Sequence, residues 1–314
     1  VPWTLLGVPL NYFIARLTAV ILIWVALWLC YRALRNCYGE GSARLGVLPG
    51  LIYVASIASD SLNHYSSELV SLPLTAAGVA LLCSTHPNRS PGYRNWLLLG
   101  LVAGLHPWAK LQTGPIGAVL GLFGLLIILN AKDADTCTKI KQSLGLMVGG
   151  LLPAIVVVIA TIGGGVWSDF YQSYILQNLI YAGEHLQESW LPSELSELHP
   201  PLLTFWIGLG SALALVLLSA TNRQKKSRLF FLGGSLLAIS LFCILFPGRP
   251  FLHYVQLLLV PAVIWSGAAL GECRKSTNKN YVASASLAII LTGTAGLLIT
   301  RLMSPLPSML GKLE

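Results

Sequence analysis

The sequence predicts an all-α integral membrane protein that crosses the bilayer many times. Of its 314 residues, 55% are hydrophobic and only 10% are charged, whereas a soluble protein has about a quarter of its residues charged. The apolar residues form about ten segments separated by short polar stretches, and the basic residues gather in alternate loops. These observations predict a single transmembrane domain, a helical bundle, over residues 1–314.

The ten segments are placed by their apolar runs, since a membrane-spanning helix needs about 20 such residues. Several of the runs are shorter than this, which indicates tilted or broken helices. In chain order, the segments are residues 9–31, 45–59, 67–84, 95–109, 114–130, 143–162, 201–219, 230–246, 252–270 and 281–301.

The charge pattern predicts the orientation of these segments. Fifteen of the 20 Lys and Arg residues lie in alternate loops, which the positive-inside rule assigns to the cytosol of a plasma-membrane protein. The chain would then begin outside the cell at Val1, with no initiator methionine and no signal peptide. We therefore expect it to be a fragment that lacks at least one earlier helix.

The longest loop on the predicted outer side is residues 163–201. It contains a run of aromatic and aliphatic side chains interleaved with polar ones, including Phe170, Tyr174, Leu176 and Leu179. Such spacing predicts an amphipathic helix that lies on the outer membrane surface.

Several functional classes fit the sequence poorly. The net charge of +8 comes from basic residues scattered over short loops, which argues against nucleic-acid binding. The six cysteines have no C-x-x-C spacing, and the chain lacks the P-loop, H-E-x-x-H and G-x-S-x-G motifs. Glycine groups such as Gly149-Gly150 and residues 163–165 indicate helix packing and turns.

The stretch from Phe246 to Trp265 carries an arginine, a histidine and a tyrosine where an apolar run begins. Arg249 lies in a P-G-R-P turn, and His253 and Tyr254 follow it directly. A cation, an imidazole and a phenol at the membrane boundary suit the anionic headgroup of a lipid. The alternative is that Arg249 snorkels to the surface and Tyr254 belongs to an interfacial aromatic belt.

A second candidate phosphate-binding group is Lys110, with Gln112 beside it. Lys110 follows His106-Pro107, which breaks one helix, and precedes Gly114-Pro115, which starts the next. Membranes tolerate irregular backbone only where it lines a cavity or packs against protein. We therefore expect Lys110 to bind a phosphate, alone or with Arg249; the alternative is snorkelling.

Two carboxylates complete the candidate site. Glu68 begins an apolar segment, which makes it a functional candidate, although a negative charge at a helix N-terminus also has a simple structural explanation. Asp60 precedes it in the same outer stretch, with His64 between them. Side chains of these types bind divalent metals, so a divalent metal cofactor is one interpretation of this stretch. Their spacing is not diagnostic of a metal site.

Four stretches together resemble the family-C membrane glycosyltransferases, in particular the protein-mannosyltransferase and aminoarabinose-transferase branch. They are LNYFIARLTAVILIWVALWLCYRALR, SSELVSLPLTAAGVALL with Glu68, GLVAGLHPWAKLQTGPIGAVL with Lys110, and GRPFLHYVQLLLVPAVIW with Arg249, His253, Tyr254 and Pro261. The resemblance covers roughly residues 10–270 and rests on the shared order of loose motifs. The three residues between Lys110 and Gly114 depart from the family pattern.

The resemblance implies transfer of a sugar from a polyprenyl-phosphate donor to a glycan, lipid or protein acceptor outside the cell. It implies that Lys110 and Arg249 neutralise the leaving phosphate, that His253 and Tyr254 orient it, and that Glu68 assists the acceptor or a metal. The family's main catalytic carboxylate lies in a first outer loop absent from this sequence. On this basis Lys110→Ala and Arg249→Ala each abolish transfer while the protein still folds. The alternatives are a transporter or flippase for an amphipathic anion, and a non-catalytic membrane subunit.

Overall fold

The structure of the chain is a computed structural model that describes residues 7–9, 11–56, 65–84, 92–184, 228–246 and 252–275. Every regular element within these ranges is a helix. The predicted all-α architecture is therefore confirmed for this part of the chain.

The long helices coincide with eight of the predicted segments. They are α2 (Tyr12–Tyr38), α3 (Glu40–Ser56), α4 (Glu68–Ser84), α5 (Tyr93–Ala109), α6 (Gly114–Leu129), α7 (Thr136–Gly163), α11 (Arg228–Leu245) and α12 (Leu259–Lys275). Shorter helical pieces are η2 (Leu111–Thr113), α8 (Trp167–Phe170), η3 (Tyr171–Leu176), α9 (Gln177–Glu184) and η5 (Leu252–Leu258). The predicted segments 201–219 and 281–301 lie outside the described residues.

The prediction of ten membrane-crossing segments does not hold in the structure. Within the described ranges, five helical stretches are long and apolar enough to cross a membrane: Tyr12–Tyr38, Leu111–Leu129, Thr136–Gly163, Arg228–Leu245 and His253–Glu272. Helices α3, α4 and α5 each have 17 residues. At about 1.5 Å per residue, 17 residues measure about 26 Å, at the lower limit for crossing a hydrocarbon core of about 30 Å, and these three helices are not among the five stretches.

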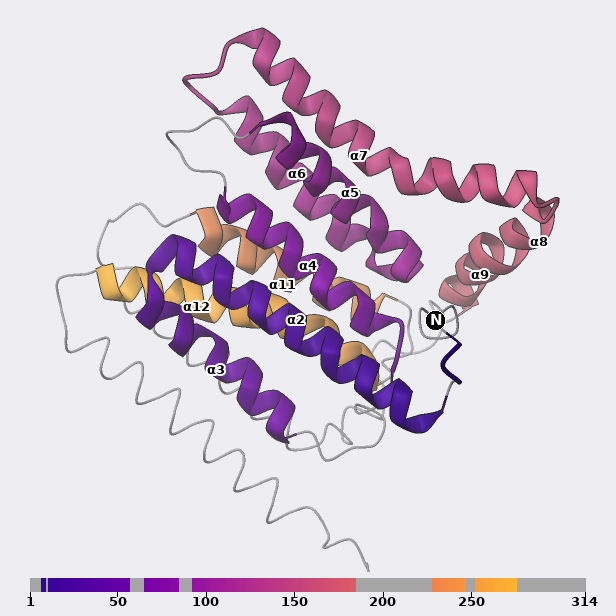
Figure 1. Cartoon of the computed structure of the whole chain (residues 1–314), viewed down its shortest axis with the longest axis horizontal. Helices are drawn as coiled ribbons and strands as arrows, with labels where there is room; N and C mark the ends of the chain where they lie inside the picture. Colours follow the sequence, from indigo (N-terminus) through magenta and orange to yellow (C-terminus); the bar gives the residue numbers. More distant parts are fainter. Residues whose placement is uncertain are drawn as a thin grey trace, which may run out of the picture.

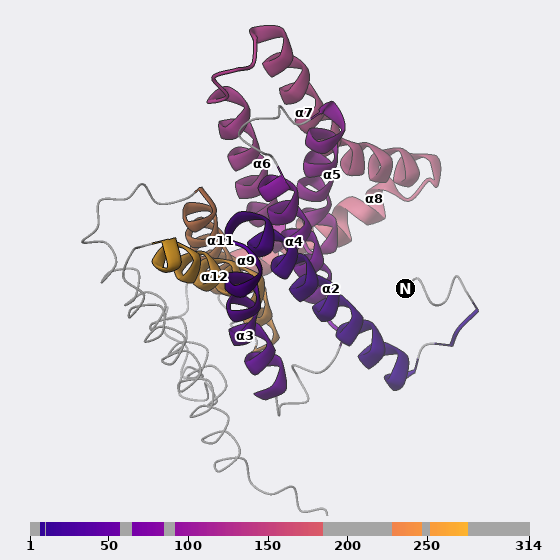
Figure 2. The ribbon, with the colours of Figure 1, turned by 60° about the vertical axis from the view of Figure 1, so that its left-hand side comes forward.

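The helices form two groups joined by α4 (Figures 1 and 2). One group contains α5, α6 and α7, and the other contains α2, α3, α11 and α12. Helix α4 contacts α2 on one side and α5 on the other. The stretch His253–Glu272 is at the centre of the second group, because most of its residues are buried. This places the start of α12 and the start of α4 close together, as contacts between α4 and η5 show.

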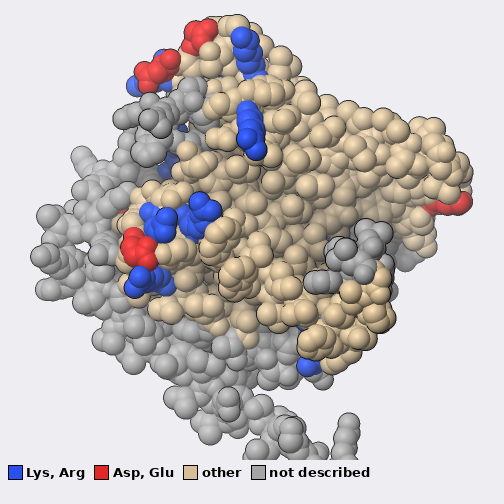
Figure 3. Space-filling view, viewed as in Figure 1, with Lys and Arg blue, Asp and Glu red and all other residues tan. Residues whose placement is uncertain are grey.

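The outer surface of the bundle carries many large apolar side chains. On α7, Met147, Leu151 and Ile159 are each more than half exposed, and Trp24 on α2 is 64% exposed. Figure 3 shows one face with a broad uncharged expanse and Lys and Arg gathered near its edges. Apolar surface of this extent is typical of helices that face lipid, so the chain is an α-helical membrane protein.

Glycines allow α5 and α7 to pack backbone against backbone. A Cβ atom on Gly100 or Gly104 of α5 would meet the main-chain oxygens of Leu146 and Gly150 of α7. In return, a Cβ atom on Gly149 would meet main-chain atoms of α5. The glycines follow the small-xxx-small spacing of tightly packed membrane helices, which confirms the packing role predicted for Gly149. Gly165 has a φ of +68°, so the predicted turn there is also confirmed.

Part of the loop predicted to hold an amphipathic helix is helical. Residues 167–184 are helical through α8, η3 and α9, and η3 is a π-helical segment. Leu179 is 60% exposed, whereas Tyr174 points back toward the end of α5. The remainder of the loop, residues 185–201, lies outside the described residues.

Candidate functional site

A break between α5 and α6 places Lys110 at the end of the bundle. Lys110 ends α5 in an extended conformation, with φ −161° and ψ 131°. The next residues form the single turn η2, and Pro115 occupies the first turn of α6, where a proline fits because no backbone N–H is needed. The predicted break in the backbone is therefore present, and Lys110 lies in it, between the end of α5 and the turn η2.

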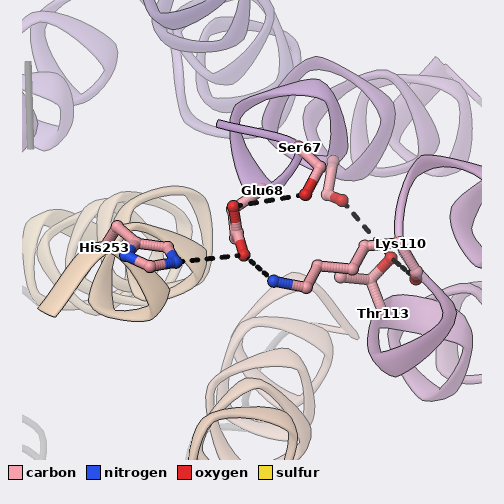
Figure 4. Close-up of polar contacts among 6 residues, drawn as sticks. Ser67, Glu68, Lys110, Thr113 and His253 are labelled. Carbon is pink, nitrogen blue, oxygen red and sulfur yellow. Dashed lines mark hydrogen bonds and ion pairs between the residues drawn. The ribbon is translucent and has the colours of Figure 1, made fainter. Parts of the chain in front are cut away.

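Lys110 forms an ion pair with Glu68, the first residue of α4 (Figure 4). The Glu68 side chain is only 1% exposed, and that of Lys110 is 23% exposed. Ser67 Oγ donates a hydrogen bond of 3.4 Å to the second carboxylate oxygen of Glu68. A carboxylate this deeply buried depends on such partners, because an isolated charge away from water costs several kcal/mol. Lys110 therefore does not snorkel into solvent.

His253 and Tyr254 reach the same pair from η5. His253 Nε2 lies 3.7 Å from Glu68 Oε1, on the other side of the carboxylate from Lys110 (Figure 4). The Lys110 ammonium lies 4.0 Å from the centre of the Tyr254 ring, within the range of a cation–π interaction. Tyr254 is 4% exposed, so it belongs to the interior of the bundle and not to an interfacial belt.

Of the other residues predicted for the site, the structure describes only Gln112. The Nε2 atom of Gln112 is buried and has no hydrogen-bond partner among the described residues, and the same is true of Ser66 Oγ. A buried donor without a partner is a position that a polar ligand would satisfy. Asp60, His64 and Arg249 lie outside the described residues, so the predicted pairing of Lys110 with Arg249 stays a prediction.

Sequence reasoning missed four buried polar residues next to the site: Ser71, Thr75, His106 and Thr113. Each is at most 3% exposed. A signal was present only for His106, because an ionisable residue inside an apolar segment is rare, whereas Ser and Thr are common there. Their contacts with one another join positions up to 42 residues apart, which no periodicity predicts.

Aromatic side chains attach the helical stretch 167–184 to the corner that holds Lys110. Trp108 stacks on Tyr174, with ring centres 5.9 Å apart, and on Phe170 at 6.2 Å. The Tyr174 hydroxyl donates a hydrogen bond to the carbonyl of Pro107. Partial burial raises the pKa of Tyr174, so its hydroxyl keeps the proton it donates at neutral pH.

Removing this hydroxyl tests how the stretch is attached. Tyr174→Phe keeps the stacked ring and loses one hydrogen bond, so we expect about 1 kcal/mol less stability in thermal unfolding. Tyr174→Ala loses the stack as well and is expected to cost more, because stacked aromatic pairs add about 0.5–1.5 kcal/mol beyond burial. Equal melting temperatures for Tyr174→Ala and the wild type would show that this stretch is not attached through Tyr174.

The site combines a positive group, an imidazole and a buried carboxylate at the boundary of an apolar bundle. Among the described residues, no group of three His, Cys, Asp or Glu side chains is arranged to hold a metal ion. Lys110 offers further N–H donors besides the one that faces Glu68, and Gln112 offers an amide. This arrangement can bind an oxyanion while the rest of its ligand lies among apolar helices.

Comparisons with protein-family models, with curated proteins and with solved structures found no match for this chain.

Proposed function

We propose that this protein is a membrane glycosyltransferase that moves a sugar from a polyprenyl-phosphate donor to an acceptor on the outer face of the plasma membrane. The observation that carries the proposal is the meeting of Glu68, Lys110, His253 and Tyr254 at one end of an apolar bundle. These residues come from three separate parts of the chain, α4, the α5–α6 corner and η5. A site of this composition at the edge of lipid suits a ligand with an anionic head and an apolar tail.

In this proposal Lys110 binds the donor phosphate. Its ammonium has three N–H donors, of which the pair with Glu68 uses one. The Nε2 amide of Gln112, buried without a partner among the described residues, would bind a second phosphate oxygen. Arg249, in the P-G-R-P turn predicted from the sequence, would add a second cation. Because Glu68 already holds Lys110, the phosphate would meet an ammonium fixed in position, which lowers the entropic cost of binding.

The proposed reaction is a single displacement at the anomeric carbon of the sugar. The acceptor oxygen or nitrogen forms the new bond to that carbon, the bond to the phosphate oxygen breaks, and the electron pair leaves with polyprenyl phosphate. Lys110 and Arg249 would stabilise the charge that develops on the leaving phosphate. A carboxylate would take the acceptor proton; Glu68 is engaged by Lys110 and His253, which leaves Asp60 as the other candidate carboxylate of this sequence.

Native mass spectrometry of the purified protein tests the donor class. The wild type should retain a polyprenyl phosphate or its glycosylated form. The double variant Glu68→Gln/Lys110→Met should lose it, because both charges of the pair are removed together. Removing both avoids a buried charge without a partner and so keeps the loss of lipid separate from a loss of folding.

The matched control is Lys139→Met. Lys139 lies in α7 and donates to the carbonyl of Leu129, on the side that the charge pattern assigns to the cytosol. This variant should retain the same lipid as the wild type. Bulk phospholipids alone, with a small soluble anion bound in the wild type, would contradict the proposal and favour a transporter.

A further inference from the structure

Four buried polar side chains form one connected cluster directly beneath Lys110. We define the hydroxyl–imidazole cluster as Ser71 and Thr75 of α4, His106 of α5 and Thr113 of η2. Ser71 Oγ donates to Thr113 Oγ1 at 3.3 Å, and Thr75 Oγ1 lies 3.1 Å from His106 Nε2. The cluster therefore joins α4 to the corner between α5 and α6 at two points.

The geometry of the cluster suits a neutral histidine. His106 Nδ1 lies 3.0 Å from the carbonyl of Val102, which can only accept, so this nitrogen carries the proton. Nε2 is then an acceptor that lies within hydrogen-bond distance of the Thr75 hydroxyl, whose single proton also faces the Ser71 carbonyl at 2.8 Å. A buried network of such bonds stabilises one arrangement of the backbone over others.

Thr113 is the member that contacts the Lys110 backbone. Its hydroxyl lies 2.8 Å from the carbonyl of Lys110 and 2.7 Å from that of His106. One hydroxyl thus bridges the last turn of α5 and the extended residue that follows it. The His106 carbonyl also accepts the N–H of Lys110, and the Lys110 carbonyl accepts that of Thr113, so the hydroxyl adds to the backbone bonds that close this corner.

We infer that the hydroxyl–imidazole cluster is a positioning device for the Lys110 ammonium, and that Thr113 is its decisive residue. The cluster fixes the Lys110 backbone relative to α4, and α4 also supplies Glu68. It therefore sets the distance between the ammonium and the carboxylate, and the position of the ammonium over the Tyr254 ring. The inference rests on the proposed function only where it predicts a change in phosphate binding.

The position of Lys110 can be measured by NMR without any ligand. Reductive methylation with ¹³C-formaldehyde labels lysine side chains and keeps their positive charge, and Lys110→Arg identifies the Lys110 signal by its absence. The ring of Tyr254 should shift this signal upfield in the wild type. In Thr113→Val, which has the same shape without the hydroxyl, the signal should move toward those of exposed lysines, and Thr113→Ser should restore it.

Thr161→Val is the matched control, because the Thr161 hydroxyl donates only to carbonyls of its own helix, α7, among the hydrogen bonds described. An unchanged Lys110 signal in Thr113→Val would overturn the inference. If Thr113→Val does not fold, Ser71→Ala decides, since it removes the bond from α4 alone. It should move the signal the same way by a smaller amount, and an unmoved signal would overturn the inference.

Binding of farnesyl phosphate in detergent separates this inference from the proposed function. Thr113→Val should weaken binding about fivefold, the factor that corresponds to one net hydrogen bond. Wild type that binds no farnesyl phosphate, together with a Lys110 signal that moves in Thr113→Val, contradicts the proposed function and leaves the positioning role intact. Equal binding and an equal signal in both proteins contradict the positioning role alone.

Discussion

Lys110→Met is expected to lower the free energy of unfolding by about 3–5 kcal/mol, the cost of leaving a buried charge without its partner. The Glu68 carboxylate has a side-chain exposure of 1%, so water cannot replace the missing ammonium. His253, at 3.7 Å, compensates only when its imidazole is protonated. The sequence alone predicted that a Lys110 variant loses transfer and still folds. The ion pair changes this expectation, because one substitution now affects both properties.

A double-mutant cycle measures the coupling between the two side chains. Unfolding is followed by circular dichroism in mixed micelles for Lys110→Met, Glu68→Gln and the double variant. The double variant should be more stable than Lys110→Met, since the neutral amide removes the unpaired charge. If the stability lost by the double variant equals the sum of the losses of the two single variants, Glu68 and Lys110 do not interact in the folded protein.

Gly149→Leu is expected to have an effect of similar size on the packing of α5 against α7. The added side chain would meet the carbonyl of Leu97, and its Cβ would lie 2.8 Å from the nitrogen of Leu101. Backbone atoms cannot rotate away as a flexible side chain can, so the two helices must separate. We expect a loss of about 3 kcal/mol or more, at the upper end of the cost of overpacking, in the same unfolding measurement.

The matched control for the packing of α5 against α7 is Gly121→Ala on α6. A Cβ atom on Gly121 would meet nothing within 4 Å, so only the backbone preference changes. Alanine is favoured over glycine inside a helix by about 1 kcal/mol, and Gly121→Ala should therefore be slightly more stable than the wild type. Gly149→Leu at wild-type stability would show that α5 and α7 do not pack through their glycines.

The sequence alone was sufficient for the positions of the helices in the described part of the chain. Apolar runs and proline or glycine breaks are local properties, so they predicted the ends of α2 to α7, α11 and α12 to within about seven residues. Within the described residues, five stretches rather than ten are long and apolar enough to cross a membrane, and the 17-residue helices α3, α4 and α5 are not among them. The length of each helix, which composition does not give, makes this difference.

The sequence also identified Glu68, Lys110, His253 and Tyr254 one at a time, since a polar group at the edge of an apolar run is conspicuous. Only the tertiary structure decided how they combine. It pairs Glu68 with Lys110 across 42 residues of chain, and it places the Tyr254 ring beneath the ammonium. Such contacts depend on which helices pack side by side. Which helices pack together follows from the energy of the whole bundle and from close contacts such as those of the glycines between α5 and α7. Neither is a property of any single segment.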